Sequence, residues 1–343
     1  MSTANLDSAD LKGVLRGGLI REDVMNKIWD ISKIPLPFTD MIGSSTAKNE
    51  YKEWTTDELA APDVTNAVVD GSDASGNDTK TGARVGNHHQ ISDKIVRVSY
   101  RADASDVIGR TKELSYQLMR RQQELRRDVE AIALLNQASV ADNGDAVAGK
   151  AGGLPSWLVT THINGTAGGF NTSTGLTVAR TPDAAAVALT EKNIRDAVES
   201  IYQEGGDPTK LMTVPSVIRK LSEYLFTSSA RVATLMSDQG KSREAAAALG
   251  SVNVFVTDFG TLTMVPNRLQ QTYTATTTAA DVFILDPEYL SLCYLHGYRT
   301  ETLAKTGLAE NRQMVVDWSL IVNTEKAHGI IGNIDVAEAV VAE

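Results

Sequence analysis

Histidines, carboxylates and one cysteine are the residues in this chain whose chemistry could support catalysis or metal binding. The five histidines His88, His89, His162, His296 and His328 are scattered, and none has a carboxylate or nucleophile at the spacing of a catalytic motif. His88 and His89 are adjacent in a stretch expected to be extended. Their side chains should point to opposite faces and cannot easily hold one ion. We therefore predict loop histidines without a metal.

The other candidate sites are also weak. The Asp- and Gly-rich stretch at residues 70–81 lacks the alternating acidic ligands and terminal Glu of an EF-hand loop. Cys293 is the only cysteine and lies in an apolar run, which is typical of a buried, unreactive thiol and excludes an intrachain disulfide. Acid pairs such as Asp196 and Glu199 fit a solvated helix face, and no phosphate-binding glycine loop occurs. We predict no enzyme activity, no cofactor and no metal.

The composition bounds the class of protein. The chain has 343 residues, enough for two or three domains, because single cores stop growing near about 250–300 residues. Its formal net charge of −10 argues against a dedicated nucleic-acid binder, which normally carries a basic patch. The N-terminal sequence has no basic region followed by an apolar run, and no stretch of ~18 apolar residues occurs. We expect no secretion signal, no membrane contact and a cytoplasm-like compartment.

One long helix, residues 104–139, is the strongest structural pattern. Apolar residues recur there at steps of three, four or seven, which is the spacing of one helical face. Ser105 or Asp106 is the expected N-cap. At about 1.5 Å per residue, ~30 residues make a rod of roughly 45 Å. Because the apolar stripe spans only about four heptads and strand-like sequence flanks it, we favour a helix laid across a sheet over a coiled coil.

The predicted helix carries a set of arginines interleaved with acidic residues. This mixed-sign pattern favours ion pairs within or between chains over a phosphate-binding track. We predict contacts between subunits for Arg120, Arg121, Arg126 and Arg127.

A long hairpin is predicted over residues 46–100. Polar and apolar residues alternate in KNEYKEWTTDELAAP and again in QISDKIVRVSYRAD, with a polar tip between them. Such a hairpin has no core of its own and is marginal in water, so it gains stability by lying on a neighbouring molecule. Tyr51 and Trp54, as strong strand formers, are candidate contacts between subunits. A disordered surface loop is the alternative.

The C-terminal half predicts a compact α/β unit. Thr190 begins a helix that the pair Gly205-Gly206 ends, and KLMTVPS and VIRKLSEYLF then predict a buried strand and a short helix. A hairpin is expected around Asp258, followed by two strands separated at Asp286-Pro287, one long strand and one short strand. Residues 140–188, before this unit, are polar loop sequence that contains the apolar stretch GGLPSWLVT.

Several stretches, in this order, resemble one known family. LPFTDMIGSSTAKNEYKEWTTDELAAP is similar to its first PF…IG element and the Trp-containing strand that follows. SYQLMRRQQELRRDVEAIALLNQ resembles its long-helix segment, and GGLPSWLVT its GGL..WL element. LTEKNIRDAVESIYQEGGDPTKLMTVPS resembles its next helix and strand. Over most of its length, the chain resembles a tailed-bacteriophage major capsid protein of the Hong Kong 97 type.

The resemblance implies an α+β, Hong Kong 97-like capsid fold with four parts. These are an N-terminal arm, an extended hairpin loop, a peripheral domain that holds the long spine helix, and an α/β axial domain. The implied boundaries are 1–45 for the arm, 46–100 for the hairpin, 101–188 with 288–322 for the peripheral domain, 104–139 for its spine helix, and 189–287 with 323–343 for the axial domain.

The resemblance also implies a function. The chain would be the structural subunit that self-assembles, as pentamers and hexamers, into the icosahedral head of a tailed phage. The head would enclose double-stranded DNA, which meets the inner face without sequence specificity. A scaffolding protein and a portal are the implied partners, with a decoration protein as a further candidate. The chain would be a virion component assembled in the host bacterial cytoplasm.

Two alternatives stay open. An encapsulin-like nanocompartment uses the same fold to enclose a cargo protein, and the sequence does not separate it from a phage head. A surface-layer or filament protein is also rich in Thr and Ala, but the expected lack of an export signal counts against it.

Overall fold

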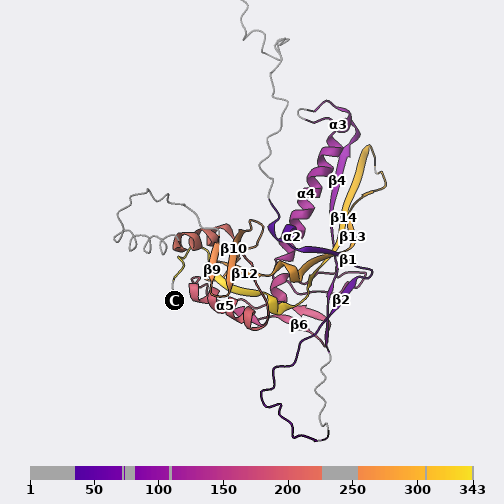
Figure 1. Ribbon diagram of the computed structural model, residues 1–343. Helices are drawn as coiled ribbons and strands as arrows, with labels where there is room; N and C mark the ends of the chain where they lie inside the picture. Colours follow the sequence, from indigo (N-terminus) through magenta and orange to yellow (C-terminus); the bar gives the residue numbers. More distant parts are fainter. Residues whose placement is uncertain are drawn as a thin grey trace, which may run out of the picture.

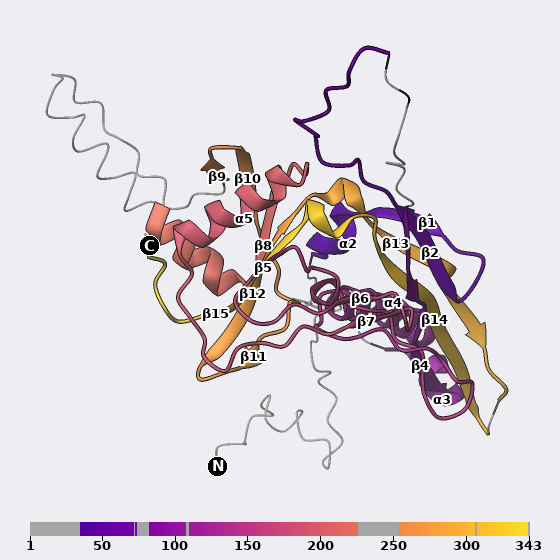
Figure 2. The same cartoon turned by 90° about the horizontal axis from the view of Figure 1, so that it is seen from below.

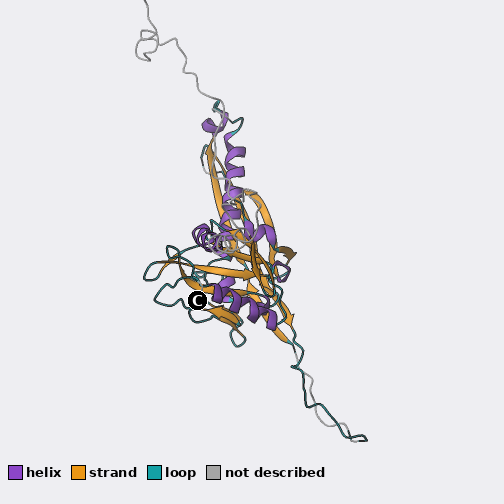
Figure 3. Cartoon of the chain, turned by 60° about the vertical axis from the view of Figure 1, so that its left-hand side comes forward, coloured by secondary structure: helices purple, strands orange, loops and turns teal. Residues whose placement is uncertain are grey.

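A computed structural model describes residues 35–71, 73, 82–107, 110–225, 254–305 and 307–341. The short helix expected within residues 1–33 and most of the polar hairpin tip lie outside these residues. The molecule is elongated (Figure 1). A narrow sheet with one long helix extends from a broader sheet, on one face of which further helices pack, and a hairpin loop (residues 57–71) projects in the opposite direction (Figure 3).

The narrow sheet has four strands in the order β1-β13-β14-β4. β1 is parallel to β13, and the other neighbours are antiparallel. The long helix α4 packs along β4 and β14, so the prediction of a helix laid across a sheet is confirmed. The elements are β1 (Gly43–Thr46), β4 (Gln90–Ser99), α4 (Glu113–Ala133), β13 (Leu290–Thr302) and β14 (Ala309–Val322).

Helix α4 is shorter than predicted. It has 21 residues, or ~31 Å at 1.5 Å per residue, and a separate short helix, α3 (Tyr100–Ala104), precedes it. The expected N-cap was also wrong, because Ser105 ends α3 by donating its hydroxyl to the Arg101 carbonyl at 2.7 Å. Lys112 stands at the N-cap of α4 without a side-chain bond, and the Asp103 carboxylate accepts from the Leu114 N–H at 3.1 Å. The apolar pattern therefore covers two helices, with side chain–backbone bonds from Ser105 and Asp103 at the ends that face each other.

The broader sheet has seven strands. Six lie in the order β5-β15-β12-β8-β10-β9, and β11 pairs with β12. Helix α5 (Glu191–Gln203) and the helical residues 215–225 pack on one face through a shared apolar cluster (Figure 2). The strands are β5 (Thr161–Ile163), β8 (Lys210–Thr213), β9 (Val254–Thr257), β10 (Gly260–Pro266), β11 (Tyr273–Thr274), β12 (Thr278–Leu285) and β15 (Gly329–Asp335).

The predicted hairpin is confirmed in part: its first strand is as expected, but its second strand is residues 83–88 and not residues 90–99. β2 (Tyr51–Thr56) pairs with β3 (Ala83–His88), whereas QISDKIVRVS forms β4 and pairs with β14. The alternation in β4 is that of a strand with one buried face, since Val96 and Val98 are buried. The hairpin therefore ends at His88, and β4 belongs to the narrow sheet.

Most elements predicted for the C-terminal half are confirmed. The Thr190 hydroxyl accepts from the Asn193 N–H at 3.0 Å, and Gly205 ends α5 with a φ of 92°. β9 and β10 form the hairpin at Asp258, and a 3₁₀ turn, Pro287–Tyr289, separates β12 from β13. Cys293 is buried, as expected.

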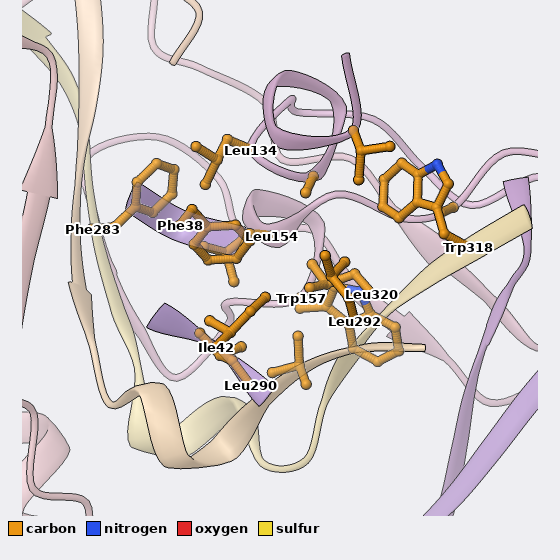
Figure 4. Close-up of a cluster of buried hydrophobic side chains, with 14 of the residues drawn as sticks. Phe38, Ile42, Leu134, Leu154, Trp157, Phe283, Leu290, Leu292, Trp318 and Leu320 are labelled. Atoms are coloured by element: carbon orange, nitrogen blue, oxygen red, sulfur yellow. The ribbon is translucent and has the colours of Figure 1, made fainter. Parts of the chain in front are cut away.

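One apolar core joins the two sheets. It contains Met212 and Phe283 from the broader sheet and Leu292 and Trp318 from the narrow one. Figure 4 shows Phe38, Leu154 and several of these side chains lying together in it. Other buried members come from α4, from the 3₁₀ turn Leu154–Ser156 and from the residues directly after them: Leu125, Val129, Ala133, Leu134, Leu154, Trp157 and Leu158.

A buried ion pair anchors the polar segment 140–188. The side chain of Arg180 is fully buried and pairs through Nη2 with the Asp281 carboxylate of β12. The Tyr273 hydroxyl donates to the same carboxylate at 2.7 Å, and burial raises the pKa of Tyr273 above its usual range. Short strands β6 (Gly169–Asn171) and β7 (Leu176–Val178) pair just before Arg180. This segment is therefore held against the broader sheet.

His328 makes the stability of the chain depend on pH. It is fully buried, its Nδ1 accepts from the Asp286 N–H at 3.2 Å, and burial lowers its pKa from 6.5 to about 3. Between these values the unfolded chain binds the proton and the folded chain does not. We therefore expect the free energy of unfolding to fall by about 1.4 kcal/mol per pH unit as pH drops below 6.5, from this group alone.

The measurement is urea unfolding between pH 7 and pH 4. His328→Gln removes the titrating group and should flatten the slope, whereas His296→Gln, at an exposed position, should leave it unchanged. Equal slopes for wild type and His328→Gln would contradict the prediction.

Candidate intersubunit surfaces

The hairpin loop is the most exposed apolar segment of the described chain. Leu59 is 98% exposed and Val64 95%, and Val68 and Val69 are also largely exposed. The loop contains four acids and no Lys, Arg or His. A monomer gains nothing from holding four large apolar side chains in water, so this loop has the character of a surface that another molecule covers.

Tyr51 and Trp54, predicted as intersubunit contacts, pack partly on their own chain. The Tyr51 hydroxyl donates to the Gly175 carbonyl at 2.9 Å, and its ring lies 4.6 Å from that of His88. The Trp54 ring lies 5.3 Å from that of Trp157. The two side chains therefore attach the base of the hairpin to its own chain, and their contact with a neighbouring subunit stays a prediction.

The neighbouring His89 is not a loop histidine. It is buried, and its Nδ1 lies 3.2 Å from an Asp317 carboxylate oxygen on β14. His88 is at the end of β3, partly buried. The prediction was wrong because the chain changes here from the hairpin to the narrow sheet, which brings His89 under β14.

The four predicted arginines of α4 differ in their surroundings. Arg120 is exposed, Arg121 pairs with Glu124 at 2.5 Å, and Arg126 lies 3.4 Å from Asp40. Arg127 is half buried and lines a polar cleft. The structure thus pairs two of them within the chain, and their role between subunits stays a prediction.

That cleft lies between α4, β4 and the turn at residues 268–272, and has a volume of about 530 Å³. Its two carboxylates are both paired with bases. The charged and neutral residues that line it are Lys94, Glu124, Arg127, Asp128, Ala131, Arg268, Leu269, Gln270, Gln271 and Thr272. The sequence does not indicate the cleft, because residues 268–272 reach α4 only through the packing of the two sheets.

Lys326 connects the base of the hairpin loop to the broader sheet. Its ammonium lies 2.9 Å from Glu58 of the loop and 2.7 Å from Glu204 at the end of α5. These hydrogen bonds, the one from Glu204 first, raise the pKa of Lys326 to about 12. The sequence offered no signal for this contact, since the three residues are far apart in the chain.

Removing this bridge should free the loop without unfolding the chain. For Lys326→Met we expect less than ~1 kcal/mol of lost stability, because exposed ion pairs contribute little. Amide exchange at residues 57–62 should become faster. Lys192→Met, which breaks an exposed pair with Asp196 inside α5, is the control and should leave the loop unchanged. Unaltered exchange in Lys326→Met would show that the bridge does not hold the loop.

Sites of other kinds are absent from the part of the chain that the structure describes. No group of three or more His, Cys, Asp or Glu is placed to hold a metal ion. No described helix is long and apolar enough to cross a membrane.

Solved structures of the same fold include a capsid and an encapsulin. The chain superposes on the capsid protein of a native GTA particle with a TM-score of 0.59 and 11% identity, over 94% of this chain and 97% of that one. It superposes on an encapsulin from Synechococcus elongatus with a TM-score of 0.56 and 10% identity, over 98% of both chains. A structure from Mycobacterium phage Adephagia gives 0.55 and 11%, over 96% and 98%. The predicted Hong Kong 97-like fold is confirmed.

The family follows from the sequence match. Residues 3–335 match the model of the SU10 major capsid protein family, and the chain therefore belongs to that family of structural capsid proteins. A major capsid protein of Escherichia phage Phieco32 is 39% identical over 113 residues, which is 33% of this chain. The match spans about a third of the length of that relative (32%). As a major capsid protein, the chain is a component of a phage particle.

Proposed function

We propose that copies of this chain assemble, as pentamers and hexamers, into the icosahedral head that encloses the double-stranded DNA of a tailed phage. The observation that carries this proposal is the hairpin loop, whose apolar side chains have no cover in a single chain. Membership of the SU10 major capsid protein family and the shell-forming structures of the same fold support it.

The mechanism follows from the shape of the chain. Rings close through heterologous contacts, in which one patch meets a different patch on the next copy. A projecting loop on one side and a helix-bearing sheet on the other supply two such patches (Figure 1). Many modest contacts, each smaller than an obligate interface, allow misplaced subunits to leave and rebind during assembly. Tyr51, Trp54 and the α4 arginines are the proposed contact residues.

Further parts of the proposal concern partners and domains. A scaffolding protein guides assembly in the host bacterial cytoplasm, a portal closes one vertex, and a decoration protein is a further candidate. DNA meets the inner face without sequence specificity, which agrees with a net charge of −10. Residues 101–188 with 288–322 form the peripheral domain, and 189–287 with 323–343 gather at the capsomer centres.

The test is the size and content of the assembled protein. We expect megadalton shells in size-exclusion chromatography and electron microscopy, and nuclease-protected DNA inside heads purified from infected cells. Protein-filled shells without DNA would favour the encapsulin-like alternative, and sheets or filaments a surface-layer protein. A chain that stays monomeric under all assembly conditions would overturn the proposal.

The hairpin and N-terminal arm are proposed to move as the shell matures. Amide exchange over residues 46–100 should then differ between the procapsid and the mature head. Equal protection in the two particles would end this part of the proposal.

A further inference from the structure

Two Asn-Gly pairs in this chain lie in different surroundings. Asn143-Gly144 is in the exposed loop closed by the bridge at residues 140 and 150, and Asn164-Gly165 is in the turn after β5. In such a pair the glycine backbone nitrogen can attack the side-chain amide carbon of the asparagine and close a cyclic imide. Glycine permits this because it has no side chain to hinder the approach. Which pair reacts therefore depends on the groups placed around it.

The Asn143-Gly144 pair has a base at the attacking nitrogen. The Gly144 N–H donates to the Asp142 carboxylate at 2.7 Å. The nitrogen must lose this proton as it attacks, and a carboxylate within hydrogen-bond distance is placed to accept it. Gly144 makes this contact with a φ of 70°, a conformation that residues with a side chain rarely adopt. Asp142 is therefore positioned as the general base.

The same pair has hydrogen-bond donors at the oxygen that becomes negative. Asn143 Oδ1 accepts from the N–H groups of residues 145, 146 and 147, at 3.1, 3.1 and 2.9 Å. Attack on the amide carbon converts this carbonyl oxygen to an oxyanion, and donors already aimed at it stabilise the charge. The three bonds also assign the amide oxygen, which leaves Nδ2 as the group that departs. Nucleophile, base and oxyanion donors thus converge on one side chain.

The Asn164-Gly165 pair is held in an unreactive form. Asn164 is half-buried with a φ of 63°, and its Nδ2, the group that would have to leave, donates to the Gly332 carbonyl at 3.1 Å. Two backbone bonds of 2.9 Å between Thr166 and Thr181 fix the turn. No carboxylate of the described residues accepts from the Gly165 N–H. The chain therefore contains its own unreactive reference for the first pair.

We propose that Asn143 is an autocatalytic deamidation site of the folded chain. The Gly144 nitrogen gives its proton to the Asp142 carboxylate and bonds to the Asn143 side-chain carbon. The tetrahedral intermediate then breaks its bond to Nδ2, which takes the proton from Asp142 and leaves as ammonia, so that an imide remains. Water, which reaches this exposed loop, opens the imide at either carbonyl and leaves aspartate or isoaspartate.

The product changes the charge and the shape of the loop. A carboxylate at position 143 stands between those of Asp142 and Asp145, and like charges at this spacing repel. In isoaspartate the backbone gains a carbon atom, so the three bonds from residues 145–147 cannot all persist. The conversion is irreversible, and the loop of an aged chain is therefore more acidic and looser than that of a fresh one.

Peptide mass spectrometry of the full-length chain during storage in neutral buffer tests the proposal. Residues 128–150 and 151–180 are separate tryptic peptides, so the two Asn-Gly pairs are followed in one digest. We expect the amide-to-acid mass change at position 143 to appear about tenfold faster than at position 164, or more, because only position 143 has the oxyanion donors. In urea, which removes both arrangements, position 143 should slow and the two rates should become similar.

Two variants of equal charge separate the base from a general effect of acidity. Asp142→Asn keeps an acceptor for the Gly144 N–H but cannot take its proton, and should slow conversion about tenfold. This is less than the ~100-fold typical of a positioned base, since water competes in an exposed loop. Asp145→Asn is the matched control and should leave the rate unchanged, because its backbone N–H still donates to Asn143.

Three results would overturn the proposal. The first is conversion at position 143 no faster than at position 164 in the folded chain. The second is faster conversion at position 143 after unfolding, which would show that the loop protects Asn143. The third is an equal rate in Asp142→Asn and Asp145→Asn, which would remove the base. None of these results depends on whether the chain forms shells.

Discussion

Gly153→Ala is expected to prevent the chain from folding stably. A Cβ at this position would lie 1.9 Å from the Leu135 carbonyl oxygen, far inside van der Waals contact. The obstacle is backbone at the end of α4, so no flexible side chain can move aside. The Gly153 N–H also donates to the Gln137 carbonyl at 3.1 Å, which holds the two segments together. We expect a loss of about 3 kcal/mol or more, since overpacking of this kind exceeds the usual cost of an extra methyl group.

The loss would spread because the residues directly after Gly153 belong to the core. Leu154 and Leu158 are fully buried in the core that joins the two sheets, and Trp157 stacks on Phe170 at 5.8 Å. If Gly153 cannot approach α4, these side chains cannot enter the core together. Stability amounts to only about 5–15 kcal/mol in total, so we expect low soluble yield and no shells.

Urea unfolding and shell yield are the measurements for this variant. Gly297→Ala is the matched control, since a Cβ there meets nothing within 4 Å, and it should change stability by less than ~1 kcal/mol. A Gly153→Ala chain that unfolds at the wild-type urea concentration would show that α4 and the following loop can separate without cost.

Glu130→Ala should detach the first described helix from α4. Glu130 is fully buried, and its carboxylate accepts from the Phe38 N–H at 2.9 Å and the Thr39 N–H at 2.7 Å. These are free donors in the first turn of α2 (Pro37–Met41), whose own N-cap residue makes no side-chain bond. Asn267 Nδ2 donates to the same carboxylate at 2.7 Å. Glu130 therefore caps α2 from another element and links it to the turn after β10.

Removing the carboxylate takes this acceptor from three donors, of which the Phe38 N–H and Asn267 Nδ2 are buried and the Thr39 N–H is partly buried. Each costs about 1–3 kcal/mol, so we expect a total loss of about 3 kcal/mol or more. Phe38, fully buried in the wild-type chain, should become exposed as α2 moves. Amide exchange at residues 37–46 should accelerate, because β1 follows α2 directly.

Two further variants calibrate this result. Glu130→Gln keeps the shape and one acceptor oxygen, so its loss of stability should be intermediate. Gln122→Ala, an exposed change on the same helix, should have little effect. Unchanged exchange at residues 37–46 in Glu130→Ala would mean that apolar packing alone holds α2.

Much of the fold is determined locally and can be predicted from the sequence. Thr190 and Gly205 set the ends of α5 through a cap and a left-handed turn, both of which depend on neighbouring residues. Apolar alternation likewise predicted the β9–β10 hairpin, and the last long strand and short strand of the prediction are β14 and β15. The order of the motifs along the chain was enough to indicate the capsid family, which the match over residues 3–335 confirms.

Other features depend on long-range packing. The predicted partner of β2 was wrong, because residues 83–88 have few core-forming side chains and were predicted as part of the polar tip, yet they pair with β2. Pairing with β14 instead placed β4 in the narrow sheet and buried His89.

The proposed contact surfaces also depend on long-range packing. Arg127 and Arg268 share a cleft, and Lys326 reaches Glu58, only because the two sheets pack on one core. The order of residues was sufficient to define most elements and the family, since caps, turns and apolar periods act over a few residues. Packing of the two sheets set which charges meet, since that depends on residues more than a hundred positions apart.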